Sequence, residues 1–130
     1  DIELRGHAIE IRINAEDPAR DFAPSPGRIE FYAAPGGPGV RIDSHAYAGY
    51  VIPPFYDSMI GKLIVNGRDR EEALVRARRA LAEFLVEGVN TTIEFAAYLL
   101  NRDAVIRGEY DTGYIQRLVD QGLPAIGRTP

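Results

Sequence analysis

The sequence contains no cysteine and only two histidines among its 130 residues. The absence of cysteine excludes disulfides, thiolate nucleophiles and zinc sites with cysteine ligands, and it is compatible with a reducing compartment. His7 and His45 are too few for a histidine-rich metal site, and the carboxylates show no evident metal-binding spacing. We therefore predict no metal site and interpret both histidines as structural.

Clustered positive charge and long apolar runs are also missing. The 15 lysines and arginines are scattered and the formal net charge is -4, so we predict no nucleic-acid partner. No apolar run approaches the roughly 18 residues of a membrane-spanning helix, and the N-terminus lacks a signal pattern. We predict a soluble domain with no membrane partner, located by default in the cytoplasm, or in the mitochondrial matrix of a eukaryote.

Motifs that bind nucleotide phosphates or supply a nucleophile are absent as well. The glycine cluster GGPG at Gly36–Gly39 lacks the Lys and Ser/Thr of a P-loop, and no GxGxxG fingerprint occurs. None of Ser25, Ser44 and Ser58 lies in a GxSxG elbow. We interpret the glycine cluster as a turn and find no candidate for nucleophilic catalysis.

The sequence does contain a clearly alternating stretch, GHAIEIRINAED, at residues 6–17. Because strand side chains alternate between two faces, its first nine residues are expected to form a half-buried strand. The apolar members that we expect in the core are Ile9, Ile11 and Ile13. The opposite face then carries a carboxylate, a guanidinium and an amide in a row, from Glu10, Arg12 and Asn14.

Further strands and turns follow in the first half of the chain. DPARDFAPSPGR has three prolines and reads as an ordered loop. Arg28–Ala33 and Gly39–Ser44 alternate again and are joined by the APGGPG turn, and Met59–Val65 is a nearly continuous apolar run, broken by Lys62, that predicts a buried strand.

Helical periodicity begins after Asp69, which forms a capping-box-like start with Glu72, and Gly88 is a plausible stop. The apolar stripe consists of Ala73, Leu74, Ala77, Ala80, Leu81, Phe84 and Leu85. The solvent face carries a mixed-charge ridge of Glu72, Arg76, Arg79 and Glu83.

Shorter helices are expected after the ridge. Thr91 with Glu94 predicts a second capping box, Asp103–Arg107 a helical turn ended by Gly108, and Asp111 a cap for a last helix. Strands first and helices later favour an α+β fold. We divide the chain into a domain at 1–122 and a tail at 123–130.

Arg12 and Asp57 are the strongest candidates for chemistry. A guanidinium can bind a carboxylate, bicarbonate or enolate through two hydrogen bonds, and Glu10 and Asn14 could fix its direction. On spacing alone, an ordinary surface arginine beside a glutamate is the simpler interpretation. Asp57 is either a carboxylate that orients a cation or a cap for the turn into the following strand, and the sequence alone favours the cap.

The longer motifs resemble the C-terminal domain of biotin carboxylase, the ATP-dependent component of acetyl-CoA, propionyl-CoA, methylcrotonyl-CoA and pyruvate carboxylases. The matching words are RGHAIEIRINAEDP, F-APSPGRI, APGGPGVRIDSHAYAGYVIPPFYDSMIGKLIV and EGVNTTIEF. The resemblance implies an antiparallel sheet with packed helices. It also implies that carboxyphosphate, made from ATP and bicarbonate, supplies CO2 to N1 of biotin.

The resemblance assigns roles residue by residue. Arg12 corresponds to the family arginine that meets bicarbonate and stabilises the biotin enolate, and Asp57 to an aspartate near the active site that is linked to the dimer contact. Thr112 corresponds to a position lining the adenine pocket. Homodimer-interface positions correspond to Pro38, Arg41, Arg76 and Glu83, although a familiar bacterial pattern has a bulky aromatic residue in place of Pro38.

The resemblance also implies partners that lie outside this chain. The family's ATP-grasp core, which binds ATP and Mg, precedes this domain, and the opening DIELRG without a methionine hints at a longer parent. We therefore predict an inactive isolated chain that works with an ATP-grasp domain, a biotin carboxyl carrier protein and a carboxyltransferase. The alternatives are a non-catalytic dimerisation and assembly module, or another ATP-grasp ligase with a similar tail.

Overall fold

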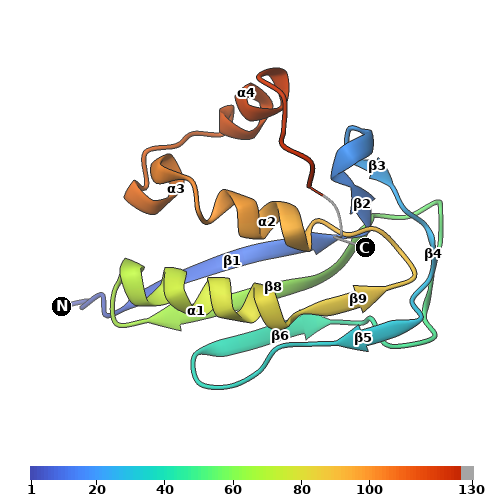
Figure 1. The fold of residues 1–130 in the computed structure, drawn as a ribbon. Coiled ribbons are helices and arrows are strands. Elements are labelled where there is room, and N and C mark those ends of the chain that lie inside the picture. Colours follow the sequence, from blue (N-terminus) through green and yellow to red (C-terminus); the bar gives the residue numbers. More distant parts are fainter. Residues whose placement is uncertain (127–130) are drawn as a thin grey trace.

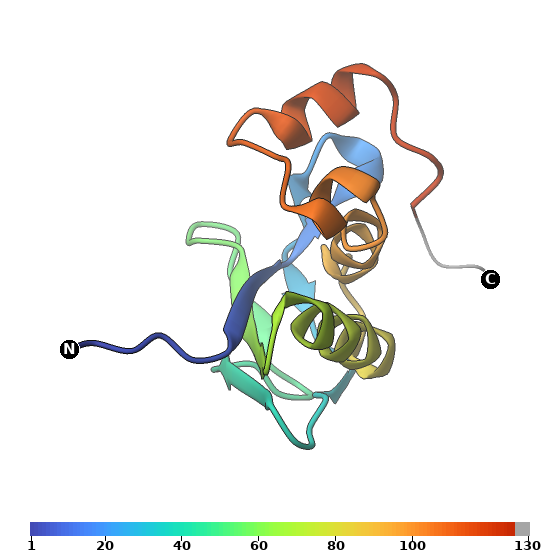
Figure 2. The same cartoon turned by 90° about the vertical axis from the view of Figure 1, so that its left-hand side faces the viewer.

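The computed structural model describes residues 1–126 and is built around a three-stranded antiparallel sheet. The strand order is β1 (His7–Asn14), β8 (Met59–Gly67), β6 (Val40–Ser44), with β8 in the centre. Helix α1 (Arg70–Glu83) packs against one face of this sheet, and Figure 2 shows no helix of the described residues on the other face. The α+β prediction with an antiparallel sheet is confirmed.

The alternation predicted for β1 is confirmed. Ile13 is fully buried, and Ile9 and Ile11 are half-buried and pack against the core, whereas Glu10 and Arg12 are exposed. Since β1 pairs only with β8 within residues 1–126, its other side is a free edge of the sheet. The register shifts between Ile13 and Asn14, which is a bulge at the end of the strand.

The core lies between β8 and α1. Leu63 and Val65 point into it from β8, and α1 contributes mostly alanines, which let the helix approach the sheet closely. A Cβ on Gly67 would lie 2.7 Å from the backbone nitrogen of Ala73, so the crossing of strand and helix requires glycine. Burying each leucine or valine side chain contributes about 1.5–3 kcal/mol.

The start of α1 is as predicted, but its end is not. Asp69 Oδ1 accepts a hydrogen bond from the backbone N–H of Glu72 at 2.9 Å. The helix ends at Glu83, before Gly88, and Leu85–Glu87 forms strand β9, paired with β5 (Phe31–Ala33). Leu85 is 52% exposed and does not belong to the apolar stripe. Strand pairing outweighs the helical pattern here because it buries Val86.

Several short strands lie in segments predicted as a loop or as one longer strand. The proline-rich segment contains β2 (Glu16–Asp17) paired with β3 (Ala23–Pro24), with a 3-10 turn between them. β4 (Gly27–Arg28) pairs with β7 (Val51–Ile52). The predicted strand Arg28–Ala33 is interrupted, because Ile29 is buried and donates its N–H to a loop carbonyl instead.

Three short helices follow and lie beyond the β1 edge of the sheet (Figure 1). They are α2 (Ile93–Leu99), α3 (Asp103–Arg107) and α4 (Tyr114–Asp120). The predicted stop at Gly108 is confirmed by its left-handed φ of 72°.

Two of the predicted caps differ from the structure. α2 begins after Thr92 without a side-chain cap, so the capping box at Thr91 is wrong. Asp111 accepts the N–H of Gly113 in the turn that precedes α4, rather than capping the helix itself. Thr91 Oγ1 lies 3.5 Å from the N–H of Ile93, and Asp111 closes a tight turn, so neither side chain forms the predicted cap.

The described residues set two limits. No helix of residues 1–126 is both long and apolar enough to cross a bilayer, and the same residues contain no group of three or more side chains able to hold a metal ion. Of the predicted tail at 123–130, the first four residues form neither helix nor strand, and 127–130 lie outside the described part.

Candidate functional site

A hollow of about 510 Å³ runs along the free edge of β1 and is called the β1-edge hollow here. Four consecutive strand residues line it, which is possible only because this edge is not paired with another strand. The β1-edge hollow is lined by Ile9, Glu10, Ile11, Arg12, Asn14 and Glu16 from the strand region, Phe22 from the loop, and residues of α2, α3, the segment before α4 and the start of α4. Most of its lining surface is apolar, and its polar side chains come both from the strand region and from the segment before α4.

Arg12 is the cation of this hollow. Its side chain is 64% exposed, and its Nε lies 3.9 Å from Glu10 Oε1, which is too long for a hydrogen bond. Within residues 1–126 this is the only ion pair of Arg12, and its guanidinium makes no hydrogen bond. Its planar set of donors is therefore free to bind an anionic oxygen.

Asn14 lines the same hollow but does not contact Arg12. Its Nδ2 donates to Glu16 Oε1 at 3.3 Å, and its backbone exchanges two hydrogen bonds with Thr92: N–H to Oγ1 at 3.0 Å, and C=O from the Thr92 N–H at 3.0 Å. Asn14 Oδ1 is buried and has no hydrogen-bond partner in the described residues. The amide thus fixes the end of β1 and leaves one acceptor unused.

Glu16 and Ser58 support this amide, although the sequence pattern did not single out either. Ser58 Oγ donates to Glu16 Oε1 at 2.5 Å, and the same oxygen accepts from Asn14. A signal for Glu16 exists in the sequence, since it continues the period-two polar series of Glu10, Arg12 and Asn14. Thr92 has no such signal, because its contact with β1 spans 78 residues.

Thr112 lines the β1-edge hollow from the turn before α4. The fold therefore brings Thr112 to the same hollow as Glu10, Arg12 and Asn14, from the opposite end of the chain. The neighbouring Asp111 accepts a hydrogen bond from Arg117 Nη2 at 2.8 Å, which lowers the pKa of Asp111 below its usual 3.8. Its carboxylate is therefore already engaged by a cation.

Asp57 lies outside this hollow. Its Oδ1 accepts the backbone N–H of Met59 at 2.9 Å, and the side chain is exposed. This geometry is that of a cap for the turn into β8, the simpler of the two interpretations offered by the sequence. No ion pair joins Asp57 to a cation in the part of the chain that the structure describes.

The four predicted interface residues lie elsewhere, on the β5–β6 loop, β6 and α1. Pro38 and Arg41 are exposed, and Arg41 Nη2 donates to Asp43 Oδ2 at 3.0 Å. Glu83 accepts from Arg79 at 3.0 Å. None of the four lines the β1-edge hollow.

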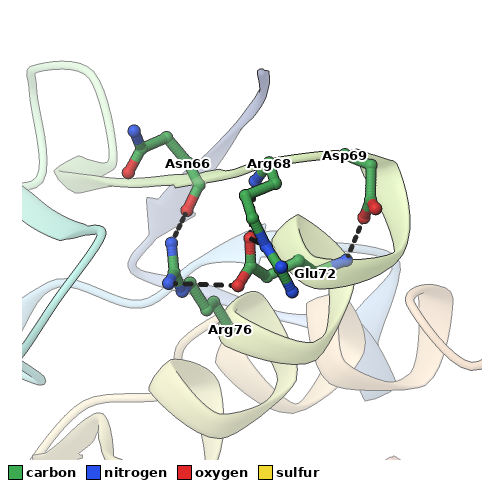
Figure 3. Close-up of polar contacts among 5 residues, drawn as sticks. All are labelled: Asn66, Arg68, Asp69, Glu72 and Arg76. Carbon is green, nitrogen blue, oxygen red and sulfur yellow. Dashed lines mark hydrogen bonds and ion pairs between the residues drawn. The ribbon is translucent and has the colours of Figure 1, made fainter.

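Arg76 belongs to a paired charge cluster at the start of α1 (Figure 3). Its Nη1 donates to the carbonyl of Asn66 at 2.6 Å and its Nη2 to Glu72 Oε1 at 3.3 Å. The backbone N–H of Arg68 donates to the Glu72 carboxylate and lowers the pKa of Glu72 below its ordinary 4.5, and the side chains of Arg68 and Arg76 act in the same direction. Each charge in this cluster has a partner.

Comparison with known proteins gives a consistent result. The family model described as biotin carboxylase C-terminal domain matches residues 10–117. The chain is 53% identical over 116 residues to biotin carboxylase 1 of Bacillus subtilis, covering 89% of this chain and 26% of that protein. It is 55% identical over 117 residues to the biotin carboxylase of a Nostoc species, covering 90% of this chain and 26% of that protein.

Solved structures show the same similarity. The biotin carboxylase domain dimer of Hydrogenobacter thermophilus 2-oxoglutarate carboxylase, in complex with MgADP, ADP and bicarbonate, has a TM-score of 0.89 at 41% identity, over 95% of this chain and 27% of that one. Rhizobium etli pyruvate carboxylase has a TM-score of 0.90 at 32% identity, over 96% of this chain and 12% of that one. The chain spans about a quarter of the length of the curated relatives that it matches.

Proposed function

Because the chain belongs to the family of biotin carboxylase C-terminal domains, we propose that it forms one wall of an active site in which biotin is carboxylated from bicarbonate with cleavage of ATP. The observation that carries the proposal is the free guanidinium of Arg12 at the β1-edge hollow. In this proposal ATP and bicarbonate give ADP and carboxyphosphate, which breaks down to CO2 and phosphate, and the CO2 replaces the proton on N1 of biotin.

Arg12 acts on the charge that develops during this reaction. When N1 of biotin loses its proton, negative charge moves onto the ureido oxygen, and a guanidinium that already points at the oxygen stabilises this charge without reorganising. The strand holds Arg12 more rigidly than a loop would. Removing one such donor typically lowers turnover by about 10²–10³-fold.

The remaining polar groups of the hollow have supporting roles in this proposal. Glu10, 3.9 Å from Arg12, limits the directions that the guanidinium can take. Asn14 holds the end of β1 through Thr92 and Glu16, and Thr112 contributes to the side of the hollow where the nucleotide base would lie. Asp57 shapes the turn into β8. ATP and Mg would be held mainly by an ATP-grasp domain outside this chain.

A homodimer interface on the β5–β6 loop, β6 and α1 is the second part of the proposal. Pro38 and Arg41 are exposed, and Arg41 is paired with Asp43. Arg76 and Glu83 are held by bonds within the chain and would present this surface in a fixed shape. The Hydrogenobacter relative, described as a domain dimer, supports this. The carrier protein and the carboxyltransferase are further proposed partners, and the isolated chain is expected to be inactive.

The test is biotin-dependent ATP cleavage by the full-length protein that contains this domain, with Arg12→Gln compared at matched dimer content. We expect turnover to fall by about 10²-fold or more, with folding and dimerisation unchanged. Arg68→Gln is the matched control, because Arg68 is an exposed arginine whose side chain pairs, within residues 1–126, only with Glu72. Unchanged turnover in Arg12→Gln would overturn the catalytic role and favour the rival function, an assembly module.

A further inference from the structure

Lys62 is the only lysine of a chain with 15 basic residues. It lies in the middle of the central strand β8, where it is half-buried between Gly61 and Leu63, both of which are buried. All the other basic residues are arginines, so a compact ammonium group occurs only at this point of β8.

Lys62 lies directly opposite Arg12. The register of the antiparallel pair places the Cα of Arg12 against the Cα of Lys62, one step from the inward pair Ile11 and Leu63. Both cations therefore point to the face of the sheet that lacks α1. Directly opposite side chains have Cβ atoms about 4.5–5.5 Å apart, and like charges in this arrangement destabilise a sheet.

Among the described residues, one carboxylate forms an ion pair with either cation, and this contact is long. Glu10 is 3.9 Å from Arg12, and Asp43, the cross-strand neighbour of Lys62 on β6, accepts a hydrogen bond from Arg41 at 3.0 Å. Lys62 makes no ion pair or side-chain hydrogen bond within residues 1–126. Two adjacent cations that lack a close carboxylate partner are stabilised when an anion binds between them.

We infer that Lys62 is a second cation beside Arg12, on the open face of the sheet next to the β1-edge hollow rather than in its lining, and that the two together hold one small oxyanion, either bicarbonate or the ureido oxygen of deprotonated biotin. The inference rests on the proposed function and adds a residue to it. The two donor groups can act on the same anion in different ways. The guanidinium binds a planar oxyanion through two parallel hydrogen bonds, and the ammonium adds a point charge.

The experiment compares Lys62→Met, Lys62→Gln and Lys62→Arg in the full-length enzyme, with kcat and the KM for bicarbonate measured separately. Methionine and glutamine keep most of the length of the side chain and remove the charge, so we expect a loss of about tenfold or more in kcat/KM, and Lys62→Arg should restore most of it. A raised KM for bicarbonate identifies bicarbonate as the anion. A lowered kcat with unchanged KM identifies the ureido oxygen.

Stability gives a readout that does not depend on turnover. Removing one of two opposed like charges should leave the Tm of Lys62→Met unchanged or higher, while the rise in Tm that bicarbonate gives the wild type should become smaller. Arg68→Met removes a charge just beyond the end of the same strand and serves as control. Wild-type kinetics in Lys62→Met, or equal damage in Lys62→Arg and Lys62→Met, would overturn the inference.

The failure of this inference is distinguishable from failure of the proposed function. If Arg12→Gln loses turnover and Lys62→Met does not, Arg12 works alone and only the second cation is excluded. If neither variant affects turnover, the catalytic role of this face is excluded altogether.

Discussion

Arg78 on α1 and Arg12 on β1 are arginines of the same domain, but their guanidinium groups have different surroundings. Arg78 donates to the carbonyl of Leu100 at 3.2 Å from Nε and 2.7 Å from Nη2. The only charged partner of Arg12 in the described residues is 3.9 Å away. The same contrast separates the neighbours of each residue: Arg76 and Arg79 are bonded to backbone carbonyls and carboxylates, whereas Lys62 has no such partner within residues 1–126.

The difference separates charges that are bonded within the fold from charges that remain available to a ligand. A guanidinium bonded to a carbonyl satisfies a backbone group that would otherwise lose its hydrogen bond, so its removal is expected to affect stability. A guanidinium that is exposed and unbonded adds little to stability, because isolated surface charges contribute within about ±0.5 kcal/mol. Its position on a rigid strand matters only when a ligand arrives.

The largest effects are expected when Arg12 and Arg78, the two arginines compared above, are replaced one at a time. In the full-length enzyme, Arg12→Gln should lower turnover by about 10²-fold or more and leave the Tm unchanged. Arg78→Gln should lower stability by about 1–3 kcal/mol, since the carbonyl of Leu100 loses both donors, while turnover per folded enzyme is retained. Steady-state kinetics and thermal unfolding check both. If both variants lost turnover while remaining fully folded, the distinction between an arginine needed for turnover and one needed for stability would be wrong.

Gly39 tests whether the paired region is as tightly built as its hydrogen bonds indicate. Its φ is 70°, and a Cβ there would lie 2.5 Å from Arg76 Nη1 and 2.7 Å from the carbonyl oxygen of Asn66. We expect Gly39→Ala to destabilise the chain by about 2–4 kcal/mol through backbone strain and displacement of Arg76. Urea unfolding measures the change.

Gly36, in the same turn, is the matched control for Gly39. A Cβ on Gly36 would meet nothing within 4 Å, and its φ is not in the left-handed region. Gly36→Ala should therefore change the free energy of unfolding by less than about 0.5 kcal/mol. Equal effects of the two substitutions would show that the contact between the β5–β6 loop and Arg76 contributes nothing to stability.

A smaller effect is expected at two helix caps. The cap predicted at Asp69 forms, and the capping box predicted at Thr91 does not. Asp69→Ala should cost about 1 kcal/mol, because Asp69 accepts the N–H of Glu72 in the first turn of α1. Thr91→Ala should be nearly neutral, since Thr91 Oγ1 is 3.5 Å from the N–H of Ile93 and α2 has no side-chain cap. Urea unfolding of both variants checks the pair, and a larger loss at Thr91 would contradict it.

The caps also indicate how much of the fold could be predicted from sequence. Local signals were sufficient for β1, whose period-two alternation needs no distant partner, and for the start of α1, where Asp69 and Glu72 are three residues apart. They failed where a distant segment competes. Leu85–Glu87 continues the helical pattern, yet it pairs with the distant segment Phe31–Ala33. Thr92 Oγ1 accepts the backbone N–H of Asn14 rather than an N–H at the helix end.

The candidate site divides in the same way. Arg12, Glu10 and Asn14 could be selected because they alternate on one strand, and the role proposed for Arg12 came from the family resemblance. The contact between the Ser58 hydroxyl and Glu16 was missed because it spans 42 residues, although Glu16 itself continues the polar series of Glu10, Arg12 and Asn14. Lys62 was noticed only as a break in an apolar run, since its position opposite Arg12 depends on the register of β1 and β8. Pairing between strands is therefore the information that the sequence lacked.

The smallest effect expected is the pH dependence of the paired cluster at the start of α1. The N–H and side chain of Arg68 lower the pKa of Glu72 below 4.5 in the folded chain. A carboxylate whose folded pKa is depressed adds stability that is present above its unfolded pKa and is lost as the pH falls through the folded value. The wild type should therefore lose stability between about pH 5 and pH 3 in part through Glu72.

Glu72→Gln is expected to flatten this acid limb, because glutamine cannot be protonated in this range. Glu71→Gln, in the same first turn of α1, changes the charge near the helix N-terminus equally and leaves the contacts with Arg68 and Arg76 intact. Urea midpoints of both variants and the wild type, measured across the range, separate the two contributions. If Glu71→Gln flattens the dependence of stability on pH as much as Glu72→Gln does, that dependence arises from the general charge at the helix end. The paired cluster would then contribute no more to folding than the exposed charges around Arg12.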